Sequence, residues 1–560
     1  MTATHPVTRP QPHVTHTVFN QSTPRVDVNE YELNPVLAEA VRRHDAAWAD
    51  DEFRAVGALV GSAEFHEDAR LANTITPELR SFDRWGNRID EVTYHPSYHS
   101  ILSAAVAHGA HTRCWADPRP GSHVARAAIF MLFAQIEPGH SCPVSMTHAV
   151  IPSLQLQPDL AARWVPKALS RSYSPDLGAD KPSAIFGMSM TEKQGGSDVR
   201  ANTTVARPAG AGGPGADYLL TGHKWFCSAP MSDAFLVLAQ AEGAGGEGLS
   251  CFLLPRMLPD GTRNVFRIQR LKDKLGNKSN ASSEIELDGT VASMVGEPGR
   301  GVRTIIEMVA QTRLDCVLGS TAGMRQSVAE ALWHARHRTA FGATLADQPA
   351  MTAVLADLAL ESEAATVTAM RLARAHDEDA GDTERAFRRL ATAVAKYWIC
   401  KRGPHHSYEA LECLGGNGYT EAFPLAMRYR EQPVMAVWEG SGNVIALDVL
   451  RAMTREPESV DAFHTEINLA RGGNPILDAH LDRLCTQLRE LKLFEPAVAQ
   501  RSARRVVEAM ALALEASLLV RFSPSAVADA FIAARLGEDR GLEYGAVPTG
   551  ADLAAILMRH

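Results

Sequence analysis

The sequence has no apolar run long enough to cross a bilayer, since no stretch approaches the ~18–20 residues that a membrane-spanning helix needs. Its opening stretch, MTATHPVTRPQPHVTHTVFNQ, is polar and rich in proline and histidine, so it contains no apolar core of a secretory signal. A composition of 45% hydrophobic and 22% charged residues is that of an ordinary globular protein. These features predict a cytoplasmic protein without a membrane partner.

Paired cysteines and excess positive charge are also missing. The chain carries 56 Lys and Arg against 65 Asp and Glu, a formal net charge of −9. This excludes bulk non-specific nucleic-acid binding but leaves room for a local basic patch. The eight cysteines are scattered without a C-x-x-C pair, so we expect reduced thiols, no disulfide framework and no metal site. They are Cys114, Cys142, Cys227, Cys251, Cys316, Cys400, Cys413 and Cys485.

The hydrophobic periodicity divides these 560 residues, too many for one core, into four parts. Helical spacing dominates 1–182, strand-like runs separated by turns fill 183–296, and helical spacing returns over 297–455 and 456–560. We therefore predict a mainly α fold with a small antiparallel β sheet or barrel, in four domains with these boundaries. The expected strands are 217–226, 233–241, 249–255, 265–271 and 282–288.

The segment WEGSGN, residues 438–443, places one acidic side chain, Glu439, directly before a glycine-rich turn and an apolar helical run. Glycine permits positive φ and a close approach of the backbone to a ligand. Ser441 or Asn443 can cap the following helix, whose free N–H groups suit a phosphate or another electron-rich ligand. A carboxylate fixed beside such a ligand is a candidate general base. The alternative is a surface glutamate in a loop.

A second candidate ligand site is the loop MTEKQGGSDVRANTT, residues 190–204. Exposed backbone amides with hydroxyl donors suit a planar heterocycle or a pyrophosphate, although structural loops often share this composition. Trp225 stands with Cys227 and Ser228 at the end of a predicted strand. Its indole belongs either to the ligand site or to the core.

Five motifs, in the family's order, resemble those of the acyl-CoA dehydrogenase flavoproteins: T-E-x-x-x-G-S-D, W-I-[ST], R-x-x-F-G-x-x-L-x-x-Q, G-G-x-G-Y and E-G-[ST]. The resemblance implies that family's fold, with an α domain, a β barrel or sheet and a four-helix α domain, here followed by an extra C-terminal helical region. The matching residues are Thr191, Glu192, Gly196, Ser197, Asp198, Trp225, Phe226, Cys227, Arg338, Phe341, Gly342, Leu345, Gln348, Gly415, Gly416, Gly418, Tyr419, Glu439, Gly440 and Ser441.

Several segments are similar to the AidB-like branch of this family, among them TEKQGGSD, RLKDKLGNKSNASSEIE, WEGSGNVIALDVLR and the last hundred or so residues. This resemblance implies FAD as cofactor and a homotetramer. It also implies association with double-stranded DNA in the alkylation response, and weak dehydrogenase activity of the isovaleryl-CoA type.

The family's chemistry implies roles for the matched residues. Glu439 is expected to remove the α-proton of a short or branched acyl-CoA thioester while a hydride leaves the β-carbon for FAD. The electrons then pass to an electron-transfer flavoprotein or another acceptor. Arg338 is expected to neutralise the FAD pyrophosphate across a subunit interface, the alternative being a solvated helix residue. Cofactor contacts are expected from Met190, Thr191, Gln194, Gly195, Gly196, Ser197, Trp225, Cys227, Ser228, Arg338, Phe341, Gln348, Gly415, Gly416, Trp438, Gly440, Ser441 and Asn443.

Three departures from the family pattern leave the acyl group and efficient turnover open. Cys227 replaces a hydroxyl residue that usually faces the flavin, so this hydrogen bond weakens or passes to Ser228. Lys193 and Gln194 replace a proline segment beside the acyl site. Trp438, which precedes the base, either stacks on the flavin or fills the acyl cavity.

The C-terminal region is the candidate DNA-binding part of the chain, although it is not basic overall. From Arg451 to His560 it holds 13 Arg and Lys against 15 Asp and Glu. Clustered arginines on one helix face suit phosphate contacts, and the alternative is a solvated face. Two functions therefore stay open: an acyl-CoA dehydrogenase, or a DNA-binding protective flavoprotein with vestigial dehydrogenase activity. The candidate DNA contacts are Arg483, Arg501, Arg504 and Arg505.

Overall fold

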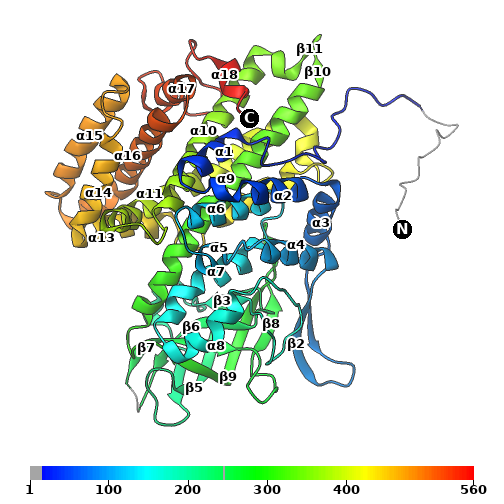
Figure 1. The fold of residues 1–560 in the computed structure, drawn as a ribbon, viewed down its shortest axis with the longest axis vertical. Helices are drawn as coiled ribbons and strands as arrows, with labels where there is room; N and C mark the ends of the chain where they lie inside the picture. Colours follow the sequence, from blue (N-terminus) through cyan, green and yellow to red (C-terminus); the bar gives the residue numbers. More distant parts are fainter. Residues whose placement is uncertain (1–14, 244–245) are drawn as a thin grey trace.

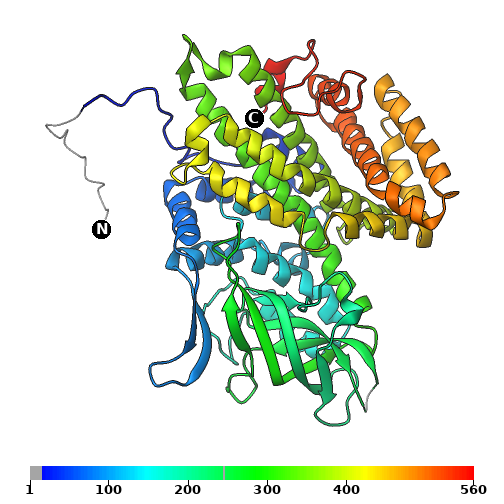
Figure 2. The same ribbon diagram turned by 180° about the vertical axis from the view of Figure 1, so that it is seen from behind.

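The β domain lies at one end of the molecule, the N-terminal and central helices form its body, and the last helices pack along one side (Figures 1 and 2). The computed structural model describes residues 15–243 and 246–560. This arrangement confirms the predicted mainly α fold with a small β domain and an extra C-terminal helical region.

The N-terminal part is built from helices whose starts are encoded locally. Helix α1, for example, begins at Pro35, and the Asn34 side chain accepts a hydrogen bond from Leu37 N at 3.1 Å. The helices are α1 (Pro35–Arg43), α2 (Asp50–Val60), α3 (Ala63–Thr74), α4 (Pro96–Ala107), α5 (Arg113–Ala116), α6 (Ser122–Ala134), α7 (Ser141–Gln155) and α8 (Pro158–Ala168), with a 3₁₀ turn η1 (Ala47–Ala49).

One hairpin interrupts this part, where helical spacing was predicted. Strands β1 (Glu78–Phe82) and β2 (Arg88–Thr93) pair antiparallel. Their turn is closed by Asp83, whose Oδ1 accepts from Trp85 N at 2.8 Å and from Asn87 N at 2.9 Å. This turn chemistry outweighs the surrounding helical pattern.

In the β domain, strands β6, β4, β5, β9 and β7 pair in sequence, and β7 pairs again with β6, which closes a small barrel. Strand β3 pairs β6, and β8 pairs β9. The pairs β3–β6 and β4–β6 are parallel and the others antiparallel. All five predicted strands are present, whereas the four-residue strands β3 and β4 were not predicted. The strands are β3 (Phe186–Ser189), β4 (Val205–Pro208), β5 (Asp217–Ser228), β6 (Ala234–Ala241), β7 (Gly248–Pro255), β8 (Arg267–Leu271) and β9 (Ser282–Val295), with a 3₁₀ turn η2 (Val199–Ala201).

The central helices form the main core. Helix α9 (Gly301–His337) is 37 residues long and buried over most of its length, because α6, α7, α10, α11 and α12 pack around it. The other central elements are the hairpin β10 (Thr339–Ala340) and β11 (Ala343–Thr344), η3 (Leu345–Asp347), α10 (Pro349–Arg374), α11 (Asp382–Glu412), η4 (Gly415–Tyr419), α12 (Leu425–Met435) and α13 (Gly442–Arg455).

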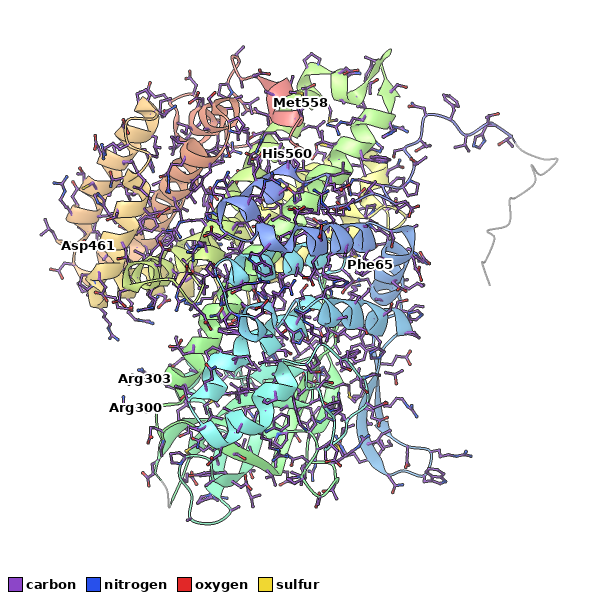
Figure 3. All side chains as sticks on the ribbon, viewed as in Figure 1. Phe65, Arg300, Arg303, Asp461, Met558 and His560 are labelled. Carbon is purple, nitrogen blue, oxygen red and sulfur yellow. The ribbon has the colours of Figure 1, made fainter. Side chains whose placement is uncertain are left out.

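The C-terminal helices return to the helical body, where the side chains of the last two residues are largely buried. Arg559 pairs with Glu363 at 3.0 Å and with Glu39 at 2.7 Å. Figure 3 shows His560 at this place and Met558 beside it. Among the described residues, none of the helices combines the length and apolar character that crossing a membrane requires. The helices are α14 (Pro457–Asn468), α15 (Pro475–Leu491), α16 (Pro496–Phe522), α17 (Ser525–Leu536) and α18 (Leu553–Leu557).

Candidate active site

Glu439 lies in the tight turn between α12 and α13, where the backbone adopts an unusual conformation. Its φ is +56°, in the left-handed region that non-glycine residues rarely adopt, and Gly440 follows with φ +107°. Such a conformation persists where the surroundings hold it in place, and it is common at functional sites. The glycine-rich sequence permits this turn but does not by itself fix it.

Two cations from distant helices hold the backbone of this turn. Lys396, on α11 and almost completely buried, donates to Trp438 O at 2.9 Å and to Gly440 O at 2.5 Å. Arg313, on α9, donates to Glu439 O at 3.1 Å, and its other nitrogen pairs with Asp448 at 2.7 Å. Three successive carbonyls are therefore fixed by charge-assisted hydrogen bonds. Sequence reasoning missed both cations, because they lie far from the turn in the chain.

The carboxylate of Glu439 is buried at its tip. Its Oε2 atom has no hydrogen-bond partner in the described structure. Burial raises the pKa of Glu439, and the Thr312 hydroxyl and the charges of Arg313 and Lys396 partly offset this shift. A buried carboxyl group with a raised pKa and an unused oxygen is suited to accept a proton from a ligand.

The surroundings of Glu439 include the start of α7 and the end of β5. Burial raises the pKa of the Cys142 thiol on α7 to about 11, and the negative charge of Glu439 adds to this shift. The same thiol hydrogen-bonds Ser228, one of the predicted residues. Trp438 also leaves its Nε1 atom buried without a partner. The predicted base, the strand end and the indole thus border one region that contains two unpartnered buried polar atoms.

The predicted loop after β3 is held by a buried ion pair that sequence reasoning did not assign to the site. Glu192 is fully buried and accepts from Lys224 Nζ at 2.8 Å and from the Thr204 hydroxyl at 2.6 Å. The Gln194 side chain donates to Glu192 at 2.8 Å and to Ala201 O at 3.1 Å, so its amide nitrogen supports the loop. Glu192 of the T-E motif is the sequence feature from which this buried ion pair could have been predicted.

The loop contacts the predicted strand end directly. Trp225 N donates to Thr191 O at 2.8 Å, which brings these two predicted residues together. Lys272 Nζ lies 3.1 Å from the centre of the Trp225 ring. A Cβ atom at Gly196 would lie 2.3 Å from Thr191 Oγ1, so a larger residue there would force the Thr191 side chain to move. Met190, Gly195 and Ser197 belong to the same loop.

Cys227 corrects one prediction. Its side chain is fully buried in the core of the β barrel, and burial raises the pKa of the thiol to about 12. The thiol therefore does not face a ligand, and the expected cofactor contact of the Cys227 side chain is wrong. Its neighbours Trp225 and Ser228 are only half-buried and stay available. Alternation along a strand, disturbed here by a bulge between Lys224 and Cys227, decides which side chain points inward.

A second group of predicted residues lies at the opposite end of the molecule, near β10 and β11 (Figure 1). Arg338 donates to Asn20 O at 2.7 Å, and Gln348 donates to Ala340 O at 2.6 Å. Phe341, at the hairpin tip, is 99% exposed. Gly415 and Gly416 are exposed in η4, with open space where a Cβ atom would stand. One chain therefore places its predicted cofactor residues in two separate groups.

The candidate DNA contacts are exposed side chains on two helices: Arg483 on α15, and Arg501, Arg504 and Arg505 on α16. Arg504 is tied to the predicted site, because its Nε atom donates to Asn443 Oδ1 at 2.8 Å. Ser441 is the residue before α13, but its side chain makes no capping hydrogen bond.

Comparison with known proteins identifies the family. Three family models match the chain: the adaptive response protein AidB N-terminal domain over residues 20–175, the acyl-CoA dehydrogenase middle domain over 187–290 and the acyl-CoA dehydrogenase C-terminal domain over 299–454. AidB of Escherichia coli (strain K12) is 46% identical over 480 residues, which cover 85% of this chain and 87% of AidB. This chain belongs to the acyl-CoA dehydrogenase family, in its AidB branch.

Two further similarities come from Caenorhabditis elegans. Acyl-CoA dehydrogenase family member 11 is 29% identical over 487 residues, covering 83% of this chain and 77% of that protein. The crystal structure of ACDH-11 in complex with C11-CoA has a TM-score of 0.85 at 26% identity and covers 96% of both chains. Fold and family therefore agree over almost the whole length.

Members of this family are FAD flavoproteins, and the chain is an FAD-dependent oxidoreductase. Its residues fit such a cofactor. The glycine-rich loop and the Trp225 strand end lie together, Glu439 Oε2 and Trp438 Nε1 are buried without protein partners, and Gly416 presents open backbone. FAD supplies the hydride acceptor that no side chain can provide.

Proposed function

We propose that the protein catalyses the α,β-desaturation of a short or branched acyl-CoA thioester, with Glu439 as the general base. The observation that carries this proposal is the buried, unpartnered Oε2 atom of Glu439 on a turn held by Lys396 and Arg313. A base acts efficiently when it is held in place and keeps a pKa near the working pH.

The proton and the electron pair have defined destinations. Glu439 would take the α-proton onto its carboxylate, and the C–H electron pair would form the new double bond. Negative charge would grow on the thioester oxygen, and the Glu439 backbone N–H is the protein donor that the family resemblance assigns to it. FAD, when bound, would supply the acceptor for the β-hydride, and an electron-transfer flavoprotein or another acceptor is the expected electron partner.

The acyl-CoA class is supported by a relative, since C. elegans ACDH-11 was crystallised with C11-CoA. The half-buried Trp438 next to the base is the residue of this chain that would limit the acyl group. Eight free cysteines, seven of them buried, support work in the reducing cytoplasm.

The proposed assembly is a homotetramer in which Arg338 and the Gly415–Gly416 segment complete the FAD site of a neighbouring subunit. Two facts support it. The hairpin β10–β11, next to Arg338, lies at the opposite end of the molecule from β5, which carries Trp225 (Figure 1). Phe341 at the tip of this hairpin is exposed. A guanidinium group at Arg338 would bind the pyrophosphate through paired hydrogen bonds. Loss of this residue would then remove cofactor and assembly together.

The second candidate function is DNA association in the alkylation response, with the dehydrogenase machinery vestigial. It is favoured by one observation: Arg501, Arg504 and Arg505 are all exposed within one turn of α16. Such contacts would bind phosphates without reading base sequence. A tetramer that aligns several patches would raise the affinity of an otherwise acidic protein for DNA.

The test of the proposed reaction is the Glu439→Gln variant. The amide keeps the shape of the side chain and cannot accept the proton. We expect the variant to bind FAD normally and to show no bleaching of the flavin by any acyl-CoA that bleaches the wild type anaerobically. Glu458→Gln, which changes an exposed carboxylate on α14, is the matched control. Equal bleaching rates in wild type and Glu439→Gln would place the base elsewhere.

A further inference from the structure

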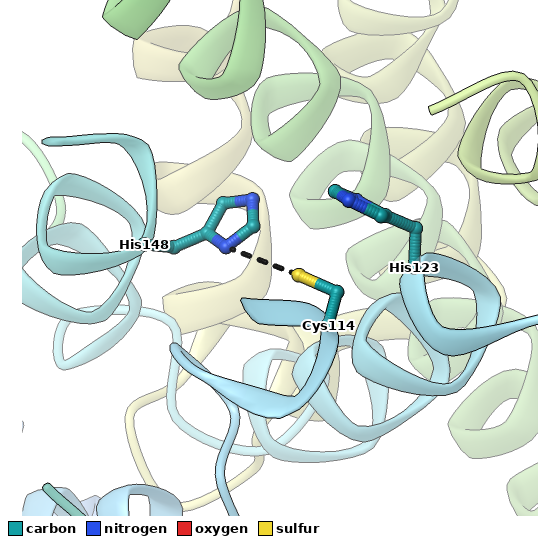
Figure 4. A group of neighbouring side chains, drawn as sticks. All are labelled: Cys114, His123 and His148. Carbon is teal, nitrogen blue, oxygen red and sulfur yellow. Dashed lines mark hydrogen bonds between the residues drawn. The ribbon is translucent and has the colours of Figure 1, made fainter. Parts of the chain in front are cut away.

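Three buried side chains outside the proposed active site form a compact cluster of nitrogen and sulfur atoms (Figure 4). Cys114 on α5, His123 on α6 and His148 on α7 are at most 3% exposed. Each offers one potential ligand atom, and these atoms all lie within 4.8 Å of one another. The residues lie on three separate helices, α5, α6 and α7, and meet because these helices pack together.

The ring of His148 turns its Nδ1 atom toward Cys114. Its Nε2 lies 3.2 Å from Gln311 Oε1, an acceptor, which places the proton on Nε2 and the electron pair on Nδ1. Nδ1 lies 3.8 Å from Cys114 Sγ and 3.3 Å from His111 O. The Trp115 indole donates to this Nδ1 at 2.9 Å and to His148 O at 3.0 Å. The indole N–H therefore still has a hydrogen-bond acceptor, His148 O, if a metal ion binds Nδ1.

His123 is the member of the cluster whose ring lacks a hydrogen-bond partner. Its Nε2 atom is buried and has no hydrogen-bond partner in the described structure. Its backbone N–H is fixed by Asp377 Oδ1 at 2.7 Å, so the residue is well placed although its ring is unsatisfied. A buried ring nitrogen without a partner is unfavourable, and a ligand at this position would satisfy it.

We propose that Cys114, His123 and His148 bind one thiophilic d¹⁰ metal ion, Cu⁺ or Zn²⁺, that ties α5, α6 and α7 together. Thiolate and imidazole are the ligands these ions prefer, and Gln311 holds His148 as metal-bound histidines are usually held. Metal bonds of about 2.0 Å to nitrogen and 2.3 Å to sulfur place ligand atoms roughly 3.3–3.8 Å apart. The Cys114–His148 pair already has that spacing, so His123 closes the site by a shift of about 1 Å.

The charge balance favours Cu⁺ over Zn²⁺. Binding releases the Cys114 thiol proton to solvent, so one thiolate and two neutral rings give a neutral site with Cu⁺ and a net positive one with Zn²⁺. A net charge in a buried site is costly, which favours the neutral Cu⁺ site. Buried Arg126 is paired with Asp315, so this cation brings no uncompensated charge to the surroundings.

The test is metal binding by the purified FAD-containing protein under anaerobic, reducing conditions. Cu⁺ is titrated in competition with bathocuproine disulfonate, and Zn²⁺ separately against a chromogenic zinc chelator. We expect one Cu⁺ per chain, with an affinity that falls at least 100-fold in Cys114→Ser and is unchanged in Cys485→Ser, which alters a cysteine outside the cluster. Tighter competition for Zn²⁺ than for Cu⁺ would keep the site and overturn the charge argument. Competition for neither ion would overturn the proposal.

A measurement on the wild type covers the case in which Cys114→Ser does not fold. X-ray absorption of the metal-loaded protein is expected to show one sulfur neighbour at about 2.3 Å and nitrogen neighbours at about 2.0 Å. Bound metal is also expected to raise the melting temperature, because the unfolded chain holds no such site. A shell of only nitrogen and oxygen neighbours would overturn the assignment. Flavin content and flavin reduction are measured in parallel, so a failure of the proposed dehydrogenase function stays distinguishable.

Discussion

The Glu439 turn and the arginine face of α16 are neighbours, yet they are built in opposite ways. At the turn, buried Lys396 and half-buried Arg313 fix three successive carbonyls and leave one buried carboxylate oxygen unused. On α16, Arg501, Arg504 and Arg505 are exposed, and the link from Arg504 to Asn443 joins them to the turn. A site that moves a proton needs fixed geometry, whereas phosphate contacts tolerate mobile charges.

The largest effect is expected from Lys396→Met, which removes the buried cation under the turn. Two half-buried carbonyls would lose this donor, at about 1 kcal/mol each, and the Glu439 backbone would relax from its positive φ. We expect the rate of flavin bleaching to fall by roughly 100-fold or more, with FAD still bound. Arg385→Met, which changes an exposed cation on the same helix, is the control. A bleaching rate close to that of the wild type would show that the turn keeps its conformation without the hydrogen bonds from Lys396.

Arg338→Ala is expected to weaken FAD binding by roughly 10-fold or more, because the pyrophosphate would lose a bidentate partner. Gel filtration with absorbance and light-scattering detection gives bound flavin and mass together. The control is Arg336→Ala, an exposed neighbour. A fully flavinated monomer would contradict the shared-site arrangement, whatever its activity.

The pH dependence should report the raised pKa of Glu439. Only the carboxylate accepts a proton, so flavin bleaching should be slow below this pKa and rise with pH through it. The Thr312 hydroxyl lowers the pKa, so Thr312→Val should move the midpoint upward. Thr454→Val, on the exposed face of α13, should leave it in place. A midpoint that moves downward would mean that Thr312 does not act on the carboxylate.

The smallest effect is expected on DNA. Duplex binding should weaken with salt, with a log–log slope of roughly −0.9 for each phosphate that the protein neutralises. Changing Arg501, Arg504 and Arg505 together to Ala should lower the affinity for DNA. The slope should become shallower by about 0.9 for each phosphate that the variant no longer binds. Binding by the triple variant with the same slope would make these arginines a solvated face.

Local sequence predicted the parts of this molecule that depend on neighbouring residues. Glu439, its glycine turn and the five longer strands follow from patterns within a few residues. The hairpin at 78–93 was missed because the residues around it have helical spacing, whereas the turn depends on hydrogen bonds to the Asp83 side chain. The Cys227 side chain was expected at the cofactor, but a bulge in β5 changes which side chains point into the barrel, and sequence alternation does not reveal the bulge.

Residues that act on the site from a distance could not be predicted in this way. Lys396 and Arg313 reach the turn from helices 44 and 126 residues away along the chain, and no spacing rule connects them. The proposed ligands Cys114, His123 and His148 also come from three separate helices. The absence of a C-x-x-C pair therefore does not exclude a metal site among them. Tertiary packing, not sequence pattern, assembles both groups.

The most direct measurement of the central claim, that Glu439 removes the α-proton, is hydrogen exchange at the substrate α-carbon. A non-oxidisable acyl-CoA analogue is incubated with the FAD-loaded protein in D₂O, and deuterium at the α-carbon is followed by mass spectrometry. The account predicts steady incorporation by the wild type and by Glu458→Gln, and none above background by Glu439→Gln. Incorporation by Glu439→Gln at the wild-type rate would contradict it.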